Sequence, residues 1–199
     1  MGRARAYVGL GANLGDAAGT LEAAIHALAA LPGARVHGVS RLYATEPVGV
    51  VDQPEFRNAV VALDVPAGRV AEEGALALLL ALKGIERAFG RQVRERWGPR
   101  EVDLDLLLFG RHLVSVERPP EGRSDDPVKA GQPLTVPHRE ARERLFVLAP
   151  LADLAPRLVP PGWGETVATA AARRLEVEGR EAVRPVARWD GATWVPLAG

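Results

Sequence analysis

Residues 101–109 read Glu-Val-Asp-Leu-Asp-Leu-Leu-Leu-Phe, and this stretch predicts a strand with one face in an apolar core. Side chains alternate between the two faces of a strand. Asp103 and Asp105 therefore lie on one face, with their Cα atoms roughly 6–7 Å apart. The residues expected on the opposite face, toward the core, are Val102, Leu104, Leu106 and Leu108.

The segments before this strand predict a strand, a helix, two strands and a second helix. The expected strands span residues 4–10, 35–44 and 56–65, and the expected helices span residues 21–31 and 72–89. With residues 101–109 the order becomes β-α-β-β-α-β, the split βαβ or ferredoxin-like pattern. We therefore predict an α+β fold with an antiparallel sheet and both helices on one of its faces.

The segments after this strand are less regular. Residues 117–133 hold several prolines and glycines and are expected to form a surface loop. Partly helical structure is expected over 139–155 and a short helix over 168–175. Residues 183–189 and 192–197 flank Asp190-Gly191, a turn signal typical of a β-hairpin. We divide the chain into a main domain, residues 1–162, and a C-terminal extension with a helix and a hairpin, residues 163–199.

The composition excludes several classes of protein. The chain has 199 residues, and its 25 Lys and Arg balance its 25 Asp and Glu, so no overall charge attracts nucleic acid or a membrane. Without cysteine there can be no disulfide, thiolate metal site or cysteine nucleophile. No apolar stretch is long enough for a signal peptide or a membrane span. We expect a cytoplasmic protein that is a monomer, with a dimer as the alternative.

The two aspartates are candidate metal ligands. Carboxylates held close together on one rigid face repel each other and favour a bound cation. Mg²⁺ suits oxygen ligands of this kind and is commonly shared with the phosphates of a substrate. The alternative is a strand whose polar face simply meets solvent.

Residues 91–100 form a basic loop directly before the aspartates. They contain Trp97 and four arginines, which are Arg91, Arg94, Arg96 and Arg100. Arginine binds phosphate oxygens with bidentate geometry, and a triphosphate needs both metal ions and guanidinium groups around it. The alternatives are a solvated basic loop and a Trp97 that only anchors the core.

A third polar cluster follows residue 133. Thr135 and His138 could contact phosphates or a nucleotide, and Arg144 could pair with phosphate, although a histidine after proline is also a common turn residue. The familiar nucleotide motifs are absent, because Gly9, Gly11 and Gly15 are spaced one residue too widely for a dinucleotide fingerprint and no P-loop is present. A kinase with this sequence must hold ATP in another way.

Four segments together resemble the 6-hydroxymethyl-7,8-dihydropterin pyrophosphokinases of folate biosynthesis. The resemblance covers about residues 4–160, and its most specific run is Arg96-Trp97-Gly98-Pro99-Arg100 followed by Asp103-Leu104-Asp105. The same segment also includes Ile85-Glu86 through Gly90-Arg91. The other segments are Gly11-Ala12-Asn13-Leu14-Gly15-Asp16; Tyr43 to Gly49 with Asp52-Gln53-Pro54 and Phe56-Arg57-Asn58-Ala59; and Leu134-Thr135-Val136-Pro137-His138 with Arg144 to Leu151.

The resemblance implies an enzyme that transfers pyrophosphate from ATP to 6-hydroxymethyl-7,8-dihydropterin and releases AMP, with residues 1–162 as its catalytic domain. It implies that Asp103 and Asp105 hold two Mg²⁺ ions. The residues implied to stabilise the reacting phosphates are Arg91, Arg94 and Arg100, with Arg96 as the alternative to Arg94. The implied ATP-binding residues are Lys83, Glu86, Arg91, Arg100, Thr135, His138, Arg139 and Arg144. The implied pterin-binding residues are Thr45, Val48, Phe56, Asn58, Trp97 and Phe146.

The residue types of the implied pterin site suit a flat, polar ring. Phe56 and Phe146 would sandwich the flat ring, and Asn58 would read its hydrogen-bonding edge. The alternative for the two phenylalanines is plain core packing. Two other functions compete with the kinase: a metal-dependent transferase of nucleotide-sugar diphosphates, which also uses Asp-x-Asp, and a pterin- or nucleotide-binding module without catalysis.

Overall fold

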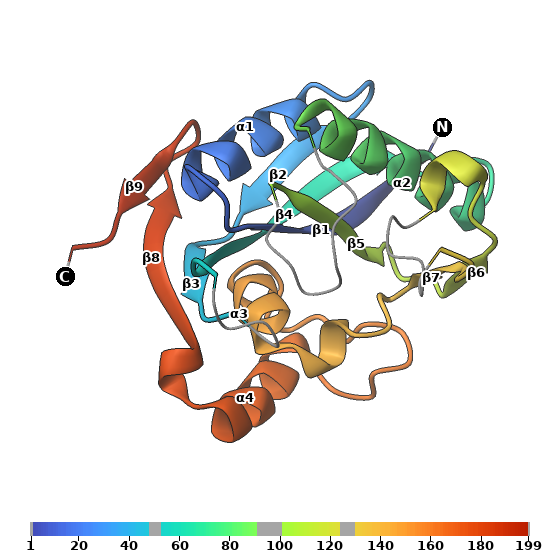
Figure 1. Ribbon diagram of the computed structural model, residues 1–199. Helices are drawn as coiled ribbons and strands as arrows, with labels where there is room; N and C mark the ends of the chain where they lie inside the picture. Colours follow the sequence, from blue (N-terminus) through green and yellow to red (C-terminus); the bar gives the residue numbers. More distant parts are fainter. Residues whose placement is uncertain (1, 48–52, 91–100, 124–129, 199) are drawn as a thin grey trace.

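The computed structural model describes residues 2–47, 53–90, 101–123 and 130–198, and its centre is a seven-stranded sheet (Figure 1). The strand order is β5-β1-β4-β3-β8-β9, and β2 also pairs with β4. The bounds of these strands are β1 Arg3–Ala12, β2 Arg35–Val39, β3 Leu42–Thr45, β4 Phe56–Pro66, β5 Asp103–Phe109, β8 Val183–Trp189 and β9 Trp194–Pro196.

The predicted ferredoxin-like core is confirmed. The pairs of β1 with β4 and with β5 are both antiparallel, as are the pairs that β4 makes with β2 and β3. The single strand expected over residues 35–44 is divided into β2 and β3 at Ser40 and Arg41. Ser40 still bonds across to Val60, whose backbone N–H donates to Ser40 Oγ at 2.9 Å while Ser40 N–H donates to the Val60 carbonyl at 2.9 Å.

Helices cover both faces of the sheet. Helices α1, Ala17–Ala29, and α2, Ala71–Ala88, pack on one face, as the sequence predicts, and share a core with β1, β4 and β5. Helices α3, Leu145–Leu154, and α4, Val167–Glu178, lie on the other face (Figure 1). The sheet is therefore the middle of three layers.

Strand β5 departs from simple alternation at its end. Leu104 and Leu106 face α1 and α2, as expected, but Leu108 lies with Leu107 in the core on the other face. The register between β1 and β5 shifts between Tyr7 and Val8, which marks a bulge in this pair. A bulge adds one residue and turns the following side chains over. The expectation that Leu108 shares the face of Leu104 and Leu106 is thus wrong.

A small separate hairpin lies beside α2. Strands β6, Val114–Val116, and β7, Leu134–Val136, pair with each other and with no strand of the main sheet among the described residues. Between them, the 3-10 turn Pro120–Gly122 contacts α2. Residues 117–133, which are expected to form a surface loop, therefore connect two short strands.

The C-terminal segment shares its core with the rest of the protein. Strand β8 pairs with β3 in the main sheet, and β8 and β9 form the predicted hairpin. Asp190 Oδ1 accepts backbone hydrogen bonds from Ala192 and Thr193 at 2.9 Å each, which closes the turn. Trp163 and Val167 are buried against α3 and the sheet. None of the described helices combines the length and the apolar character needed to cross a membrane.

We expect the Trp163→Ala variant to lose about 3–5 kcal/mol of unfolding free energy, because Trp163 is only 7% exposed within the core under α3. Urea unfolding followed by circular dichroism measures this loss. Val177→Ala, on the same C-terminal segment but 70% exposed, should change stability by less than about 0.5 kcal/mol. Equal stability of the two variants would contradict the integration of this segment into the core.

Candidate active site

The register of β1 brings the aspartates and Asn58 onto one face of the sheet. Gly11 pairs with Asp103 on one side and with Asn58 on the other, and Gly9 pairs with Asp105. A Cβ atom at Gly11 would lie 3.2 Å from Asn58 Oδ1, so the glycine leaves open space between the carboxylates and the amide. Asp103 and Asp105 are both half-buried. The predicted metal ligands and a predicted pterin ligand therefore share one surface.

The neighbouring strands extend this surface. Asn58 Nδ2 donates to Thr45 Oγ1 at 2.8 Å, and both residues are buried. Phe56 lies directly opposite Thr45 in the pair of β3 with β4 and is half-buried. Phe146, in the first turn of α3, packs beside the core of Tyr43 and Leu145. Predicted pterin residues from β3, β4 and α3 thus border the same face.

Helix α2 presents an ion pair to the edge of β5. Lys83 Nζ donates to Glu86 Oε2 at 2.6 Å, and both side chains are buried. Glu86 Oε1 accepts a 2.8 Å hydrogen bond from the backbone N–H of Leu104, the residue between the two aspartates. The pair of Lys83 and Glu86, both predicted to line the ATP site, therefore also holds the strand that carries Asp103 and Asp105.

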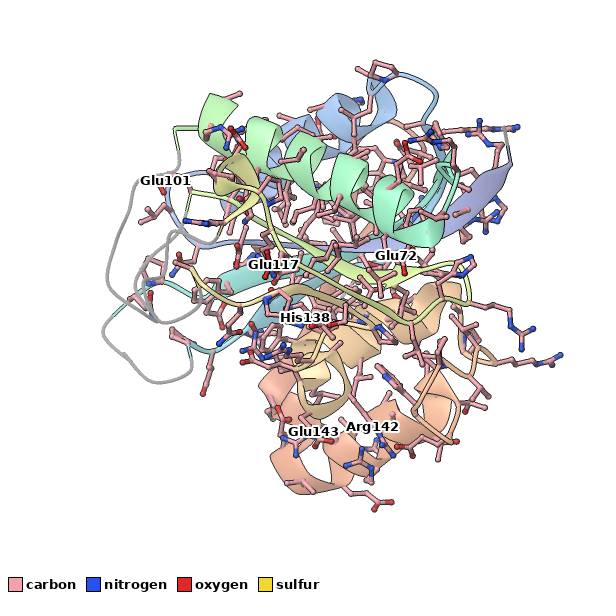
Figure 2. All side chains as sticks on the ribbon, turned by 90° about the vertical axis from the view of Figure 1, so that its right-hand side faces the viewer. Glu72, Glu101, Glu117, His138, Arg142 and Glu143 are labelled. Carbon is pink, nitrogen blue, oxygen red and sulfur yellow. The ribbon has the colours of Figure 1, made fainter. Side chains whose placement is uncertain are left out.

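Strand β7 leads into the predicted nucleotide cluster. The backbone N–H of His138 donates to the Leu107 carbonyl at 2.8 Å, which ties the end of this strand to β5. His138 lies between the layer of α2 and the layer of α3 and α4 (Figure 2). Arg139 Nε donates to Thr135 Oγ1 at 3.1 Å, and Arg144 pairs with Glu140 while its guanidinium lies 5.5 Å from the Phe146 ring.

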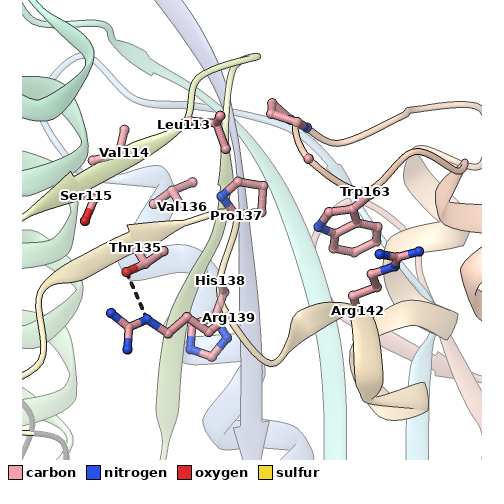
Figure 3. A pocket seen from close by; sticks show the side chains of 12 residues that line it. Leu113, Val114, Ser115, Thr135, Val136, Pro137, His138, Arg139, Arg142 and Trp163 are labelled. Atoms are coloured by element: carbon pink, nitrogen blue, oxygen red, sulfur yellow. Dashed lines mark hydrogen bonds between the residues drawn. The ribbon is translucent and has the colours of Figure 1, made fainter.

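An open cavity of about 400 Å³ adjoins this cluster (Figure 3). Thr135, His138 and Arg139 line one side, and Trp163 lines another. Backbone and side chains of the β6–β7 hairpin form part of its wall. Three predicted ATP residues therefore border one hollow in the surface.

Arg118 lies near Asp105 and Glu86, although no sequence pattern predicts it at the site. It follows β6, is half-buried, and has a buried Nε without a hydrogen-bond partner in the part of the chain that the structure describes. Burial lowers the pKa of Arg118, while the charges of Asp105 and Glu86 raise it and that of Arg139 lowers it. A lone arginine beside prolines carries no motif that would have singled it out.

Asn13 and Tyr43 form buried hydrogen bonds that support the segments around the site. Asn13 is 2% exposed, and its Nδ2 donates to Gln53 Oε1 at 3.0 Å and to the Pro54 carbonyl at 3.1 Å, so it anchors the segment before Phe56. The Tyr43 hydroxyl donates to the Asp153 carboxylate at 3.0 Å, and burial raises the pKa of Tyr43. Asn13 belongs to the glycine-rich segment quoted above, which is the one sequence signal that could have identified it.

Some predicted site residues lie outside the described residues. These are Val48, Arg91, Arg94, Arg96, Trp97 and Arg100. Their predicted roles stay predictions.

The donor set fits Mg²⁺. Within the described residues, no group of three or more histidine, aspartate or glutamate side chains is arranged to hold a metal ion. Two carboxylates on one open face are the donor set that Mg²⁺ accepts when water and substrate phosphates complete its shell. The residues present therefore suit a metal that arrives with a nucleotide.

Residues 7–156 match the family described as 7,8-dihydro-6-hydroxymethylpterin-pyrophosphokinase (HPPK). The chain belongs to the HPPK family. A relative from Methylorubrum extorquens, named 2-amino-4-hydroxy-6-hydroxymethyldihydropteridine pyrophosphokinase, is 44% identical over 179 residues, which cover 90% of this chain and 98% of the relative. A relative of the same name from Pseudomonas aeruginosa is 43% identical over 157 residues, 79% of this chain and 84% of the relative.

Solved structures support the HPPK fold independently. The crystal structure of Plasmodium falciparum HPPK-DHPS with pteroate superposes with a TM-score of 0.73 over 98% of this chain at 15% identity. The chain covers 48% of that protein, so it spans about half of the two-part molecule. At this identity the likeness concerns the fold alone.

We expect Glu86→Gln to lose about 3–5 kcal/mol of unfolding free energy, because it removes the partner of the buried Lys83 ammonium. The double variant Lys83→Met/Glu86→Gln removes both charges and keeps an oxygen that can accept from Leu104 N–H. It should recover most of the lost stability in urea unfolding. A double variant as unstable as the single one would contradict the ion pair as the cause.

Proposed function

We propose that the face formed by β1, β3, β4 and β5 carries out the reaction of the HPPK family. In that reaction a pyrophosphoryl group passes from ATP to 6-hydroxymethyl-7,8-dihydropterin, giving the pterin pyrophosphate and AMP, as a step of tetrahydrofolate synthesis. The observation that carries the proposal is the register of β1, in which Gly11 pairs with both Asp103 and Asn58. Acceptor-binding and metal-binding groups then lie one strand apart.

The pterin would lie over Asn58. The bond from Asn58 Nδ2 to Thr45 orients the amide and directs its Oδ1 toward the space above Gly11. An amide held in this way can accept from a heterocyclic N–H, and aromatic rings stack well on a planar heterocycle. Phe56 and Phe146 supply those rings, with Val48 and Trp97 as further proposed contacts.

The triphosphate would lie along β5 and the start of α3. Asp103 and Asp105 would hold two Mg²⁺ ions, which supply charge neutralisation between the phosphates when bound. Thr135, His138, Arg139 and Arg144 border the same region and offer donors for phosphate or ribose oxygens. Arg91, Arg94 and Arg100 are proposed to stabilise the reacting phosphate, with Arg96 as the alternative to Arg94.

Lys83 and Glu86 are proposed to act on ATP mainly through β5. Glu86 accepts from the Leu104 N–H and so fixes the backbone between the two carboxylates. Since a small displacement of a ligand can cost much of the rate, a fixed backbone here favours a preorganised site.

The chain needs no strong general base for this chemistry. Phosphoryl transfer depends mainly on positioning and on stabilisation of charge. The proposed roles of this chain are to hold the pterin hydroxymethyl oxygen in line with the β-phosphorus and to keep cationic groups around the phosphates. The rival nucleotide-sugar transferase would leave the Asn58–Thr45 pair and the two phenylalanines without a role.

The purified protein with Mg²⁺, ATP and 6-hydroxymethyl-7,8-dihydropterin should release AMP in proportion to the pterin consumed. Separation of nucleotides by liquid chromatography measures this directly. Release of ADP alone would point to a different transfer, and ATP binding without pterin-dependent turnover would favour a binding module.

Asp103→Asn and Asp105→Asn should each lower the rate of AMP release by about a hundredfold or more, because even outer partners of metal ligands cost 10- to 100-fold. The fold should persist, since both side chains lie outside the buried core. Glu72→Gln, an exposed change of the same kind on α2, is the matched control and should keep normal activity. An aspartate variant with near-normal turnover at modest Mg²⁺ would show that this residue is not a metal ligand.

A further inference from the structure

We propose that Tyr43 is a positioning residue for the pterin, which fixes helix α3 on strand β3 and thereby sets the place of Phe146 relative to Asn58. This role rests on the proposed function and adds to it a residue to which neither the sequence motifs nor the family resemblance gave a task. Tyr43 acts through Phe146 and not by contact with a substrate.

The first observation is the place of Tyr43 on the sheet. Tyr43 lies directly opposite Asn58 in the pair of β3 with β4, and Thr45 follows two residues later on the same face of β3. Directly opposed residues of two antiparallel strands have Cβ atoms about 4.5–5.5 Å apart. Tyr43 is therefore the neighbour of the amide proposed to read the pterin, yet it is only 4% exposed.

The second observation is the packing of Tyr43 with α3. Tyr43 shares a buried cluster with Leu145 and Val183. Phe146 and Ala149 of α3 pack against this cluster. Leu145 and Ala149 are four residues apart and so lie on one side of the helix. Because Phe146 directly follows Leu145, the rotation of α3 about its axis decides where the Phe146 ring points.

The third observation is a hydrogen bond near the other end of α3. The Tyr43 hydroxyl lies 3.1 and 3.0 Å from the two carboxylate oxygens of Asp153, in the last turn of the helix. Asp153 follows Ala149 by four residues and therefore lies on the same side of α3. Arg41 also donates to Asp153, from its backbone N–H at 3.0 Å and from Nη2 at 2.6 Å.

These contacts hold α3 at both ends of the side that faces β3. The cluster with Leu145 holds its first turn, and the bond to Asp153 holds its last turn. Burial raises the pKa of Tyr43, and the charge of Asp153 adds to the rise, so the hydroxyl stays a donor at neutral pH. Removal of this hydroxyl breaks the second contact and leaves the ring in the cluster. Since binding groups need firm support to keep their productive geometry, the bond should affect how tightly the pterin binds.

The test compares five proteins: wild type, Tyr43→Phe, Asp153→Ala, the double variant of these two, and Tyr7→Phe. Tyr7 is the matched control, because it is 8% exposed in the core under α3 and α4. It lies on β1 four residues from Gly11, which is roughly 13 Å along the strand. Steady-state AMP release gives kcat and the KM values for the pterin and for ATP, and urea unfolding gives the stability of each variant.

Tyr43→Phe should raise the pterin KM about fivefold or more, because a hydrogen bond to a charged group shifts an equilibrium by about tenfold or more. The KM for ATP should change less than about twofold, and Tyr7→Phe should keep both KM values. The double variant should have the pterin KM of Asp153→Ala alone, since both changes break the same bond.

An unchanged pterin KM in Tyr43→Phe would overturn the proposed role of Tyr43. So would a further rise in the double variant, because Tyr43 would then not act through Asp153. An equal rise of the KM for pterin and for ATP, or a rise in Tyr7→Phe as large as in Tyr43→Phe, would also overturn it, because either result would show a general loss of order. A wild-type protein that releases no AMP with the pterin would instead contradict the proposed function itself.

Discussion

The hydrogen-bonded register of β1 between β4 and β5 is the constraint on which the site depends. One residue, Gly11, faces Asn58 on one neighbour and Asp103 on the other. A slip of one residue would turn every side chain of a strand to the opposite face and would separate the amide from the carboxylates. The buried side chains of β1 prevent such a slip, because Val8, Leu10 and three alanines pack under α1 and α2. The core that stabilises the fold therefore also sets the geometry of the site.

The helical layer on the other face of the sheet adds predicted site residues from outside the sheet. Its helix α3 begins at the site and brings Arg144 and Phe146 to it. Helix α4 and Trp163 bury the outer part of this layer, and β8 covers the edge of β3, where Thr45 lies. Arg184 of β8 pairs with Glu55, which precedes Phe56. The C-terminal segment thus supports the strands and the helix that border the proposed pterin site.

The sequence predicted the features that depend on local pattern. Strand alternation identified β1, β4 and β5, helical spacing identified α1 and α2, and their order identified the ferredoxin-like topology. Asp103 and Asp105 could be placed on one face because alternation holds from Val102 to Leu106. The bulge that turns Leu108 over depends on pairing with β1, and nothing within residues 101–109 signals it.

Long-range contacts account for what the sequence could not predict. Glu86 is predicted to line the ATP site, but its bond to Leu104 could not be predicted, because it spans 18 residues and depends on how α2 docks beside β5. Arg118 comes close to Asp105 and Glu86 only because β6 pairs with β7 and the following turn packs on α2. Asn13 lies in a recognised segment, but its contacts to Gln53 and Pro54 are 40 and 41 residues away. The contacts of each of these residues depend on tertiary packing.

The most direct test of the account is a crystal structure with α,β-methylene-ATP, the pterin, and Mn²⁺ in place of Mg²⁺. The anomalous scattering of manganese locates the metal without assumptions about the surrounding density. The account predicts anomalous peaks in coordination distance of the Asp103 and Asp105 carboxylates, on the face that also carries Asn58. Metal bound to the nucleotide with neither aspartate as a ligand would contradict it.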